Sequence, residues 1–237
     1  MLKACLNGPR TPRDHERLPA RADEIAADVV RVVAAGADAV HLHVKDDDGV
    51  DTLHGEPLAA VLRAVRASAP GVPVGVTTGA WAEPDPHARI ARIGSWTALP
   101  DFASVNWHED GAEQVAEALL ERGVGVEAGL WHVGAVASWS ASPLRDRCLR
   151  VLLELPDGLD EAATDREVER LLASVGGTRL PILVHGLGSS CWPALRQAVS
   201  RGLSTRIGLE DVLVLPDGTP APDNAALVAA ARALGAR

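Results

Sequence analysis

The sequence predicts an α/β fold of the (β/α)8 TIM-barrel class. Eight short apolar runs alternate with stretches of helical periodicity along 237 residues. The chain is 47% hydrophobic, enough for one large core, and its length suits a single barrel domain over residues 1–237. An open doubly wound sheet is the alternative arrangement of the same pattern. No linker or change in composition marks a second domain.

The expected strands are apolar runs that end in polar or glycine-rich turns. Asn7-Gly8-Pro9 ends the first run, and Thr78-Gly79 ends the third. In chain order, the eight expected strands cover residues 2–6, 38–44, 73–77, 102–106, 125–130, 148–153, 181–184 and 205–209.

The expected helices show apolar residues that recur with a period near 3.6. Gly36 follows the first of them in the manner of a glycine C-cap. The helices are expected over residues 22–35, 56–67, 85–93, 111–122, 160–174, 192–201 and 222–235. A weaker helical stretch follows the fifth strand.

Composition excludes several classes of partner. The net charge is −9 and no basic stripe is present, which excludes a nucleic-acid-binding protein. No apolar run reaches the roughly 18 to 20 residues that a membrane span requires, so no membrane partner is expected. Three widely spaced cysteines predict reduced thiols and a cytoplasmic protein, with Cys5 and Cys148 as core residues.

Polar residues follow seven of the expected strands at their carboxyl ends. Active sites of (β/α)8 barrels lie at this end, so we expect these side chains to converge on one pocket. They are Asn7, Arg10, His41, His43, Thr77, Thr78, Ser104, Asn106, Glu127, His185, Arg206, Glu210 and Asp211.

His41 and His43 form a His-x-His pair at the end of the second strand. Residues two apart on a strand point to the same side, so both imidazoles face one metal position. Glu210 at the end of the eighth strand is close enough across the barrel to complete a site of two histidines and one carboxylate. Three protein ligands with an open position are typical of catalytic zinc, although manganese, cobalt and nickel stay open.

Five segments of the chain together resemble the β-keto acid cleavage enzyme family. They are ACLNGPRTP, VHLHVKDDDG, VTTGA, ASVN and TRIGLEDVLVLPDGTPAPDNAALV, in this order along nearly the whole chain. The HLH and GLED motifs are the most specific. The resemblance implies a (β/α)8 barrel with one Zn²⁺ per chain, in a homo-oligomer. It also implies a Claisen-type exchange in which a β-keto acid and acetyl-CoA give acetoacetate and a new CoA thioester.

The resemblance also implies roles for individual residues. It places the two histidines and Glu210 at the metal-ligand positions and Asp211 at the general base. Arg206 and Thr77 fall on the two positions that support this base, and Thr77 keeps the hydroxyl of the serine common in the family. Arg206 would orient Asp211 and lower its pKa. The residues expected to bind substrate are Asn7, Arg10, Thr78, Gly79, Asn106 and Glu127.

Two departures from the best-known member of the family affect the expected substrate. Arg10 stands where that member has a glutamate for the amino group of its substrate. A guanidinium would bind a second carboxylate instead, unless it pairs with Asp14 or Glu16 on a surface loop. The family's Glu-x-Glu on the fifth strand is reduced to Glu127-Ala128-Gly129, which enlarges the pocket or changes the end group that it accepts.

Two other functions fit the same residues. A metal-dependent aldolase or lyase would use the same enolate chemistry without CoA. The other alternative is a barrel that has lost catalysis and only binds a metal or ligand. The missing second glutamate of the fifth strand suggests it. The Gly186–Ser190 turn resembles a phosphate-binding loop for CoA, but an ordinary strand-to-helix turn is the preferred interpretation.

Overall fold

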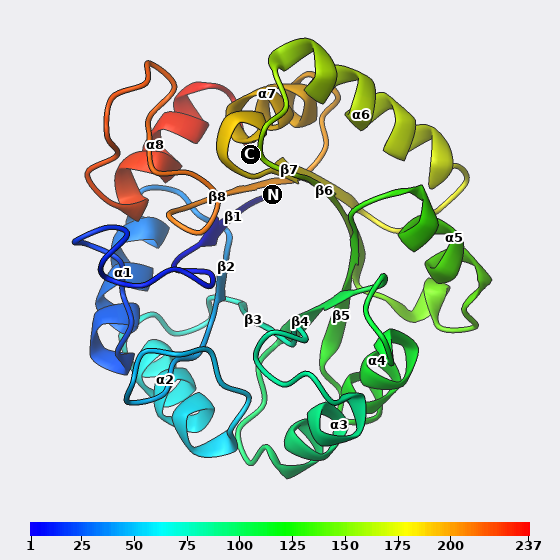
Figure 1. Cartoon of the computed structure of the whole chain (residues 1–237). Helices are drawn as coiled ribbons and strands as arrows, with labels where there is room; N and C mark the ends of the chain where they lie inside the picture. The colour runs from blue at the N-terminus through cyan, green and yellow to red at the C-terminus, as the bar shows by residue number, and fades with distance from the viewer.

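The eight predicted strands form one parallel sheet that curls into a barrel (Figure 1). The computed structural model describes residues 1–237. The strands are β1 Leu2–Cys5, β2 Ala39–Leu42, β3 Val74–Thr77, β4 Phe102–Asn106, β5 Gly125–Leu130, β6 Arg150–Leu155, β7 Ile182–Gly186 and β8 Thr205–Ile207. Their order is β7-β6-β5-β4-β3-β2-β1-β8, and a bridge between Leu183 and Ser204 brings β7 to β8. The (β/α)8 prediction is confirmed.

Eight helices surround the barrel, one after each strand. They are α1 Ala22–Ala34, α2 Gly55–Ser68, α3 Pro86–Ser95, α4 Ala112–Glu121, α5 Val133–Ala141, α6 Glu161–Ser174, α7 Cys191–Ser200 and α8 Asn224–Ala233. The side chains of Asp85, Asp160 and Asp223 accept hydrogen bonds from backbone N–H groups in the first turns of α3, α6 and α8, as N-caps do. No helix is long and apolar enough to cross a membrane.

Strand boundaries differ from the prediction by up to two residues, most clearly at β2, β6 and β7. The second strand was predicted over residues 38–44, but it ends at Leu42, so His43 follows it. The sixth strand was predicted over residues 148–153, but it runs from Arg150 to Leu155. The seventh continues to Gly186, past the predicted end at Val184. The prediction stopped each strand at its last aliphatic residue, whereas Glu154 and His185 continue the pairing and face each other in register.

A buried charged cluster fills part of the barrel interior. The Lys3 ammonium contacts a Glu127 oxygen at 2.5 Å, and Arg150 Nε lies 3.2 Å from the other oxygen. Both cations also lie 5.5 Å from the ring centre of Phe102, and Gly75 leaves the room that this ring occupies. Glu127 is fully buried in this cluster.

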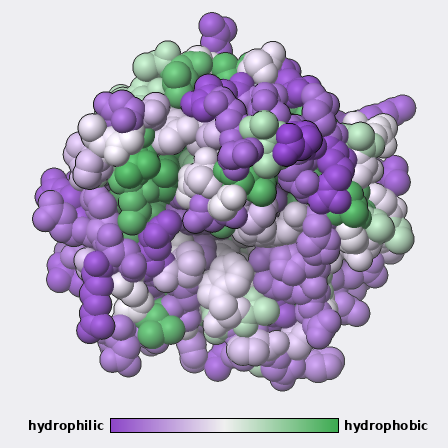
Figure 2. All heavy atoms as spheres, turned by 45° about the horizontal axis from the view of Figure 1, so that its top comes forward, coloured by the Kyte–Doolittle hydropathy of each residue, from purple (hydrophilic) through white to green (hydrophobic).

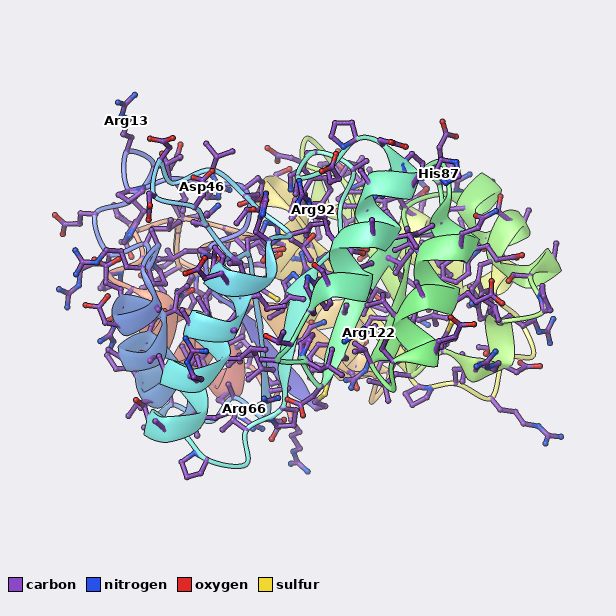
Figure 3. All side chains as sticks on the ribbon, turned by 90° about the horizontal axis from the view of Figure 1, so that it is seen from below. Arg13, Asp46, Arg66, His87, Arg92 and Arg122 are labelled. Carbon is purple, nitrogen blue, oxygen red and sulfur yellow. The ribbon has the colours of Figure 1, made fainter.

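The two ends of the barrel carry different segments. Arg13 and Asp46, in the loops after β1 and β2, lie along the upper edge of Figure 3, and Arg66 at the end of α2 lies near the lower edge. The upper edge is therefore the carboxyl end of the strands, where the site residues are expected. The face in Figure 2 is mostly hydrophilic, with hydrophobic atoms in separate patches.

Candidate active site

His41, His43 and Glu210 come together at the carboxyl end of the barrel. One ligand atom from each lies within 4.8 Å of the others. Nε2 of His41 is 3.9 Å from Oε2 of Glu210, and Nε2 of His43 is 3.8 Å from Oε1. All three side chains are at most 8% exposed. Three donors this close with separations near 4 Å surround a point that a metal ion could occupy.

The donors also have the chemical state that a metal requires. Burial holds the pKa of His41 well below its usual value, so its imidazole is neutral and offers a lone pair. Oε2 of Glu210 is buried and has no hydrogen-bond partner, which is costly for a carboxylate oxygen unless a cation satisfies it. Two imidazoles and one carboxylate suit zinc, so these residues fit the predicted metal.

Asp51 fixes the orientation of His43. Its Oδ2 lies 2.6 Å from Nδ1 of His43 and also accepts a hydrogen bond of 2.8 Å from Nε1 of Trp81. Lys45 pairs with the other oxygen of Asp51, and Trp81 stacks on the His43 ring. Because Nδ1 is engaged, Nε2 is the nitrogen left to bind a metal. The sequence analysis did not identify Asp51, whose only signal is its place a few residues after the His-x-His pair.

Arg206 joins the two adjacent carboxylates that follow β8. Its Nη2 lies 2.8 Å from Oδ1 of Asp211 and 2.9 Å from Oε1 of Glu210, and its Nε donates to Oδ1 of Asp211 at 3.1 Å. Burial raises the pKa of Asp211 to about 7, and the opposing effect of Arg206 is smaller. The predicted lowering by Arg206 is therefore present but outweighed. Asp211 itself is fully buried.

A cavity of about 460 Å³ lies beside this cluster. Of the residues predicted to form the site, those that line it are Arg10, His41, His43, Thr77, Ser104, Asn106, Arg206 and Glu210. Trp81, Trp131 and Glu154 also line it, and Trp131 donates a hydrogen bond of 3.1 Å to Asn106 Oδ1. Thr77 accepts a hydrogen bond from the backbone N–H of Gly79 and lies on the cavity wall without a hydrogen bond to Asp211.

Four residues expected to bind substrate lie elsewhere. The Asn7 amide bridges the backbone of His43 and Pro19, so it joins the segments after β1 and β2. The hydroxyl of Thr78 donates to the Ser104 carbonyl, and Gly79 lies under the Trp81 ring. Glu127 is paired with Lys3 and Arg150 inside the barrel. These four residues support the structure around the site and do not line the cavity.

Arg10 lies at the cavity without an ion-pair partner. Its only hydrogen bond is a long one of 3.4 Å from Nε to the Glu210 carbonyl. Asp14, one of the alternative partners predicted from sequence, is instead held by Thr11. The Arg10 guanidinium is therefore available to an anionic ligand.

The turn after β7 does not offer a free phosphate site. The backbone N–H of Ser189 donates to Oδ1 of Asp157 at 2.8 Å, so a carboxylate already occupies the place of an anion. This agrees with an ordinary strand-to-helix turn. His185 is buried and is not among the residues that line the cavity.

Comparisons with known proteins match nearly the whole chain. A family model described as "beta-keto acid cleavage enzyme" matches residues 1–237. The chain is 24% identical to a 3-keto-5-aminohexanoate cleavage enzyme of Fusobacterium nucleatum, over 96% of this chain and 88% of the relative. It is 28% identical to a 3-oxoadipate:acetyl-CoA acetyltransferase of Cupriavidus necator, over 94% of this chain and 83% of the relative.

Solved structures share the fold. The ternary complex of ObcA with a C4-CoA adduct and oxalate matches with a TM-score of 0.72 and 20% identity. The match covers 94% of this chain but only 64% of the ObcA chain, less than two thirds of its length. A 3-dehydroquinate dehydratase from Geobacillus kaustophilus matches with a TM-score of 0.63 and 10% identity, over 100% of this chain and 92% of its own. At these identities the likeness concerns the fold alone.

Proposed function

Because the chain belongs to the beta-keto acid cleavage enzyme family, we propose that it exchanges the acyl group of a β-keto acid with acetyl-CoA. The products are acetoacetate and a new CoA thioester. The name of the relative that transfers an acetyl group between 3-oxoadipate and acetyl-CoA supports acetyl-CoA as the co-substrate. The observation that carries the proposal is the cluster of His41, His43 and Glu210 on the wall of the cavity.

We propose that the cluster holds one Zn²⁺ ion. A bound divalent metal would polarise the keto oxygen of the substrate and stabilise an enolate. Asp211 is the proposed general base for the α-carbon proton, since its pKa near 7 suits proton abstraction at neutral pH. Arg206 orients Asp211 through two hydrogen bonds to Oδ1. Thr77 and Asn106 line the cavity where the substrate would lie.

We also propose that the substrate carries a second carboxylate, which Arg10 binds. The free guanidinium at the cavity favours an anion over the ammonium group of a 3-keto-5-aminohexanoate. 3-Oxoadipate, which has carboxylates at both ends, is therefore the first substrate to test. A single domain over residues 1–237, a homo-oligomeric state and a cytoplasmic location remain predictions.

The metal proposal is tested by elemental analysis of the purified protein and of a His41→Ala/His43→Ala variant. We expect about one zinc ion per chain in the wild type and its loss in the folded variant. A folded wild type that neither contains nor binds a divalent metal would exclude metal-assisted enolate formation.

A further inference from the structure

Glu154 of β6 occupies space that Gly129 of β5 leaves open. A Cβ atom on Gly129 would clash with Oε1 of Glu154 and would lie 2.8 Å from Oδ1 of Asn106. Glu154 is only 4% exposed, yet it lines the cavity. The missing side chain on β5 thus lets a carboxylate from the neighbouring strand reach the cavity wall.

The His185 side chain contacts the Glu154 carboxylate. The two residues are paired in the register of β6 and β7, and Nε2 of His185 lies 2.9 Å from Oε2 of Glu154. Burial holds the pKa of His185 well below its usual value, so the ring is neutral and donates one N–H group. Its other nitrogen, Nδ1, lies 3.8 Å from Oδ1 of Asp211. The Glu154–His185 pair therefore lies between the cavity and the proposed base.

We infer that Glu154 is a further catalytic residue, the general acid that protonates the α-carbon of the departing acetoacetate. The inference rests on the proposed function, in which carbon–carbon cleavage leaves an electron pair on that carbon. The Glu154 carboxylic acid gives its proton to this pair and becomes a carboxylate, which accepts the N–H of His185. Over one turnover Asp211 gains the proton that Glu154 loses, and water in the cavity returns both groups to their starting states.

The surroundings of Glu154 suit an acid. Burial raises the pKa of Glu154, and the positive charges of Arg206, Lys3 and His108 oppose this only in part. A raised pKa is the direction that a general acid requires, because it strengthens the hold of the carboxyl group on its proton. Glu154 also lines the cavity, so its carboxyl group can meet a carbon atom of the substrate there.

Replacement of Glu154 by Gln tests the inference directly. With 3-oxoadipate and acetyl-CoA, we expect Glu154→Gln to lower kcat about 100-fold or more, while KM and metal content change little. Glu113→Gln is the matched control, because Glu113 is an exposed carboxylate of α4 without an ion pair. A folded Glu154→Gln enzyme with kcat within threefold of the wild type would overturn the inference.

A second set of variants moves the carboxylate without removing it. Gly129→Ala should displace Glu154 and reduce kcat, because the new methyl group would clash with Oε1 of Glu154. Gly129→Ala/Glu154→Asp shortens the acid by one methylene and should recover part of the lost rate. No recovery in the folded double variant would indicate that Gly129 acts through another group, and would count against Glu154.

The pairing with His185 can be measured without turnover. In ¹⁵N NMR spectra, Glu154→Gln should shift the Nε2 signal of His185, assigned with a His185→Gln variant, and Glu113→Gln should leave it unchanged. If the Nε2 chemical shift of His185 is the same in Glu154→Gln as in the wild type, the proposed contact between Glu154 and His185 is wrong. A wild type that shows this coupling but converts no β-keto acid would instead refute the proposed function.

Discussion

Gly8 lies directly against Glu210. A Cβ atom on Gly8 would stand 2.5 Å from Cγ of Glu210, and the φ angle of Gly8 is +57°. The absence of a side chain after β1 thus allows the carboxylate that follows β8 to reach the two histidines. The NGP segment of the first loop is therefore part of the framework of the proposed metal site.

Replacement of Gly8 by Ala should weaken metal binding. The methyl group would push Glu210 away from His41 and His43, and we expect the zinc dissociation constant to rise about tenfold or more. Gly49→Ala is the control, because Gly49 also has a positive φ of +79° but no atom within 4 Å of its Cβ position. Both variants should lose about 1–2 kcal/mol of stability, but only Gly8→Ala should lose zinc affinity. Equal affinities in competition with a chelator would contradict this role of Gly8.

Removal of the Asp51 carboxylate should also weaken metal binding. Asp51 engages Nδ1 of His43 at 2.6 Å and thereby directs Nε2 toward the site. We expect Asp51→Asn to bind zinc roughly 10- to 100-fold more weakly, as is usual for the partner of a histidine ligand. Asp48→Asn changes an exposed carboxylate in the same turn and should bind as the wild type does. Calorimetric titration with zinc measures both, and unchanged affinity in Asp51→Asn would refute the role of this contact.

Arg10 should determine which end group the substrate carries. Loss of a charge-assisted hydrogen bond costs roughly 1.5–3 kcal/mol, so Arg10→Gln should lower kcat/KM for 3-oxoadipate about 10- to 100-fold. Arg13→Gln provides the control, since Arg13 is in the same loop but projects away from the molecule (Figure 3). Initial rates over a range of 3-oxoadipate concentrations give kcat/KM for each variant. The proposal fails if Arg10→Gln retains full kcat/KM, or if the wild type prefers 3-keto-5-aminohexanoate.

The metal-free protein should lose stability as the pH rises from about 4 to 7. Burial raises the pKa of Asp211 to about 7, above about 3.9 in an unfolded chain. The folded state binds this proton more tightly, so the contribution is complete below about pH 4 and is lost as pH rises through about 7. Urea unfolding of chelator-treated protein should show a smaller pH dependence for Asp211→Asn than for the wild type. Identical dependences would mean that Asp211 does not titrate in this window.

Sequence patterns predicted the eight strands, and they predicted that His41, His43 and Glu210 lie together, because these features follow from the order of residues in each strand. The His-x-His pair was predicted on a strand, where both rings share a side, although β2 ends at Leu42 and His43 follows it. The barrel then brings β2 near β8 across β1. The depth of a residue in the barrel depends on the register between strands, which the sequence does not display. Glu127 was therefore predicted at the cavity although it lies in the interior.

Glu154 shows the opposite error. The aliphatic run of the sixth strand stops at Leu153, so Glu154 fell outside the predicted strand and received no role. In the structure the strand continues to Leu155, and the Glu154 side chain turns toward the space above Gly129. The missing side chain at Gly129 of β5 and the carboxylate of Glu154 on β6 can be related only when the register between the strands is known.

The fate of the acetyl group tests the proposed exchange most directly. The zinc-loaded protein would be given 3-oxoadipate and acetyl-CoA labelled with ¹³C at the acetyl carbonyl, and the products followed by NMR. We predict that the label appears at the keto carbon of acetoacetate, with a new CoA thioester formed in equal amount and no reaction without acetyl-CoA. Cleavage of the β-keto acid when acetyl-CoA is omitted, or cleavage in its presence with the label left in acetyl-CoA, would contradict the exchange and indicate a lyase.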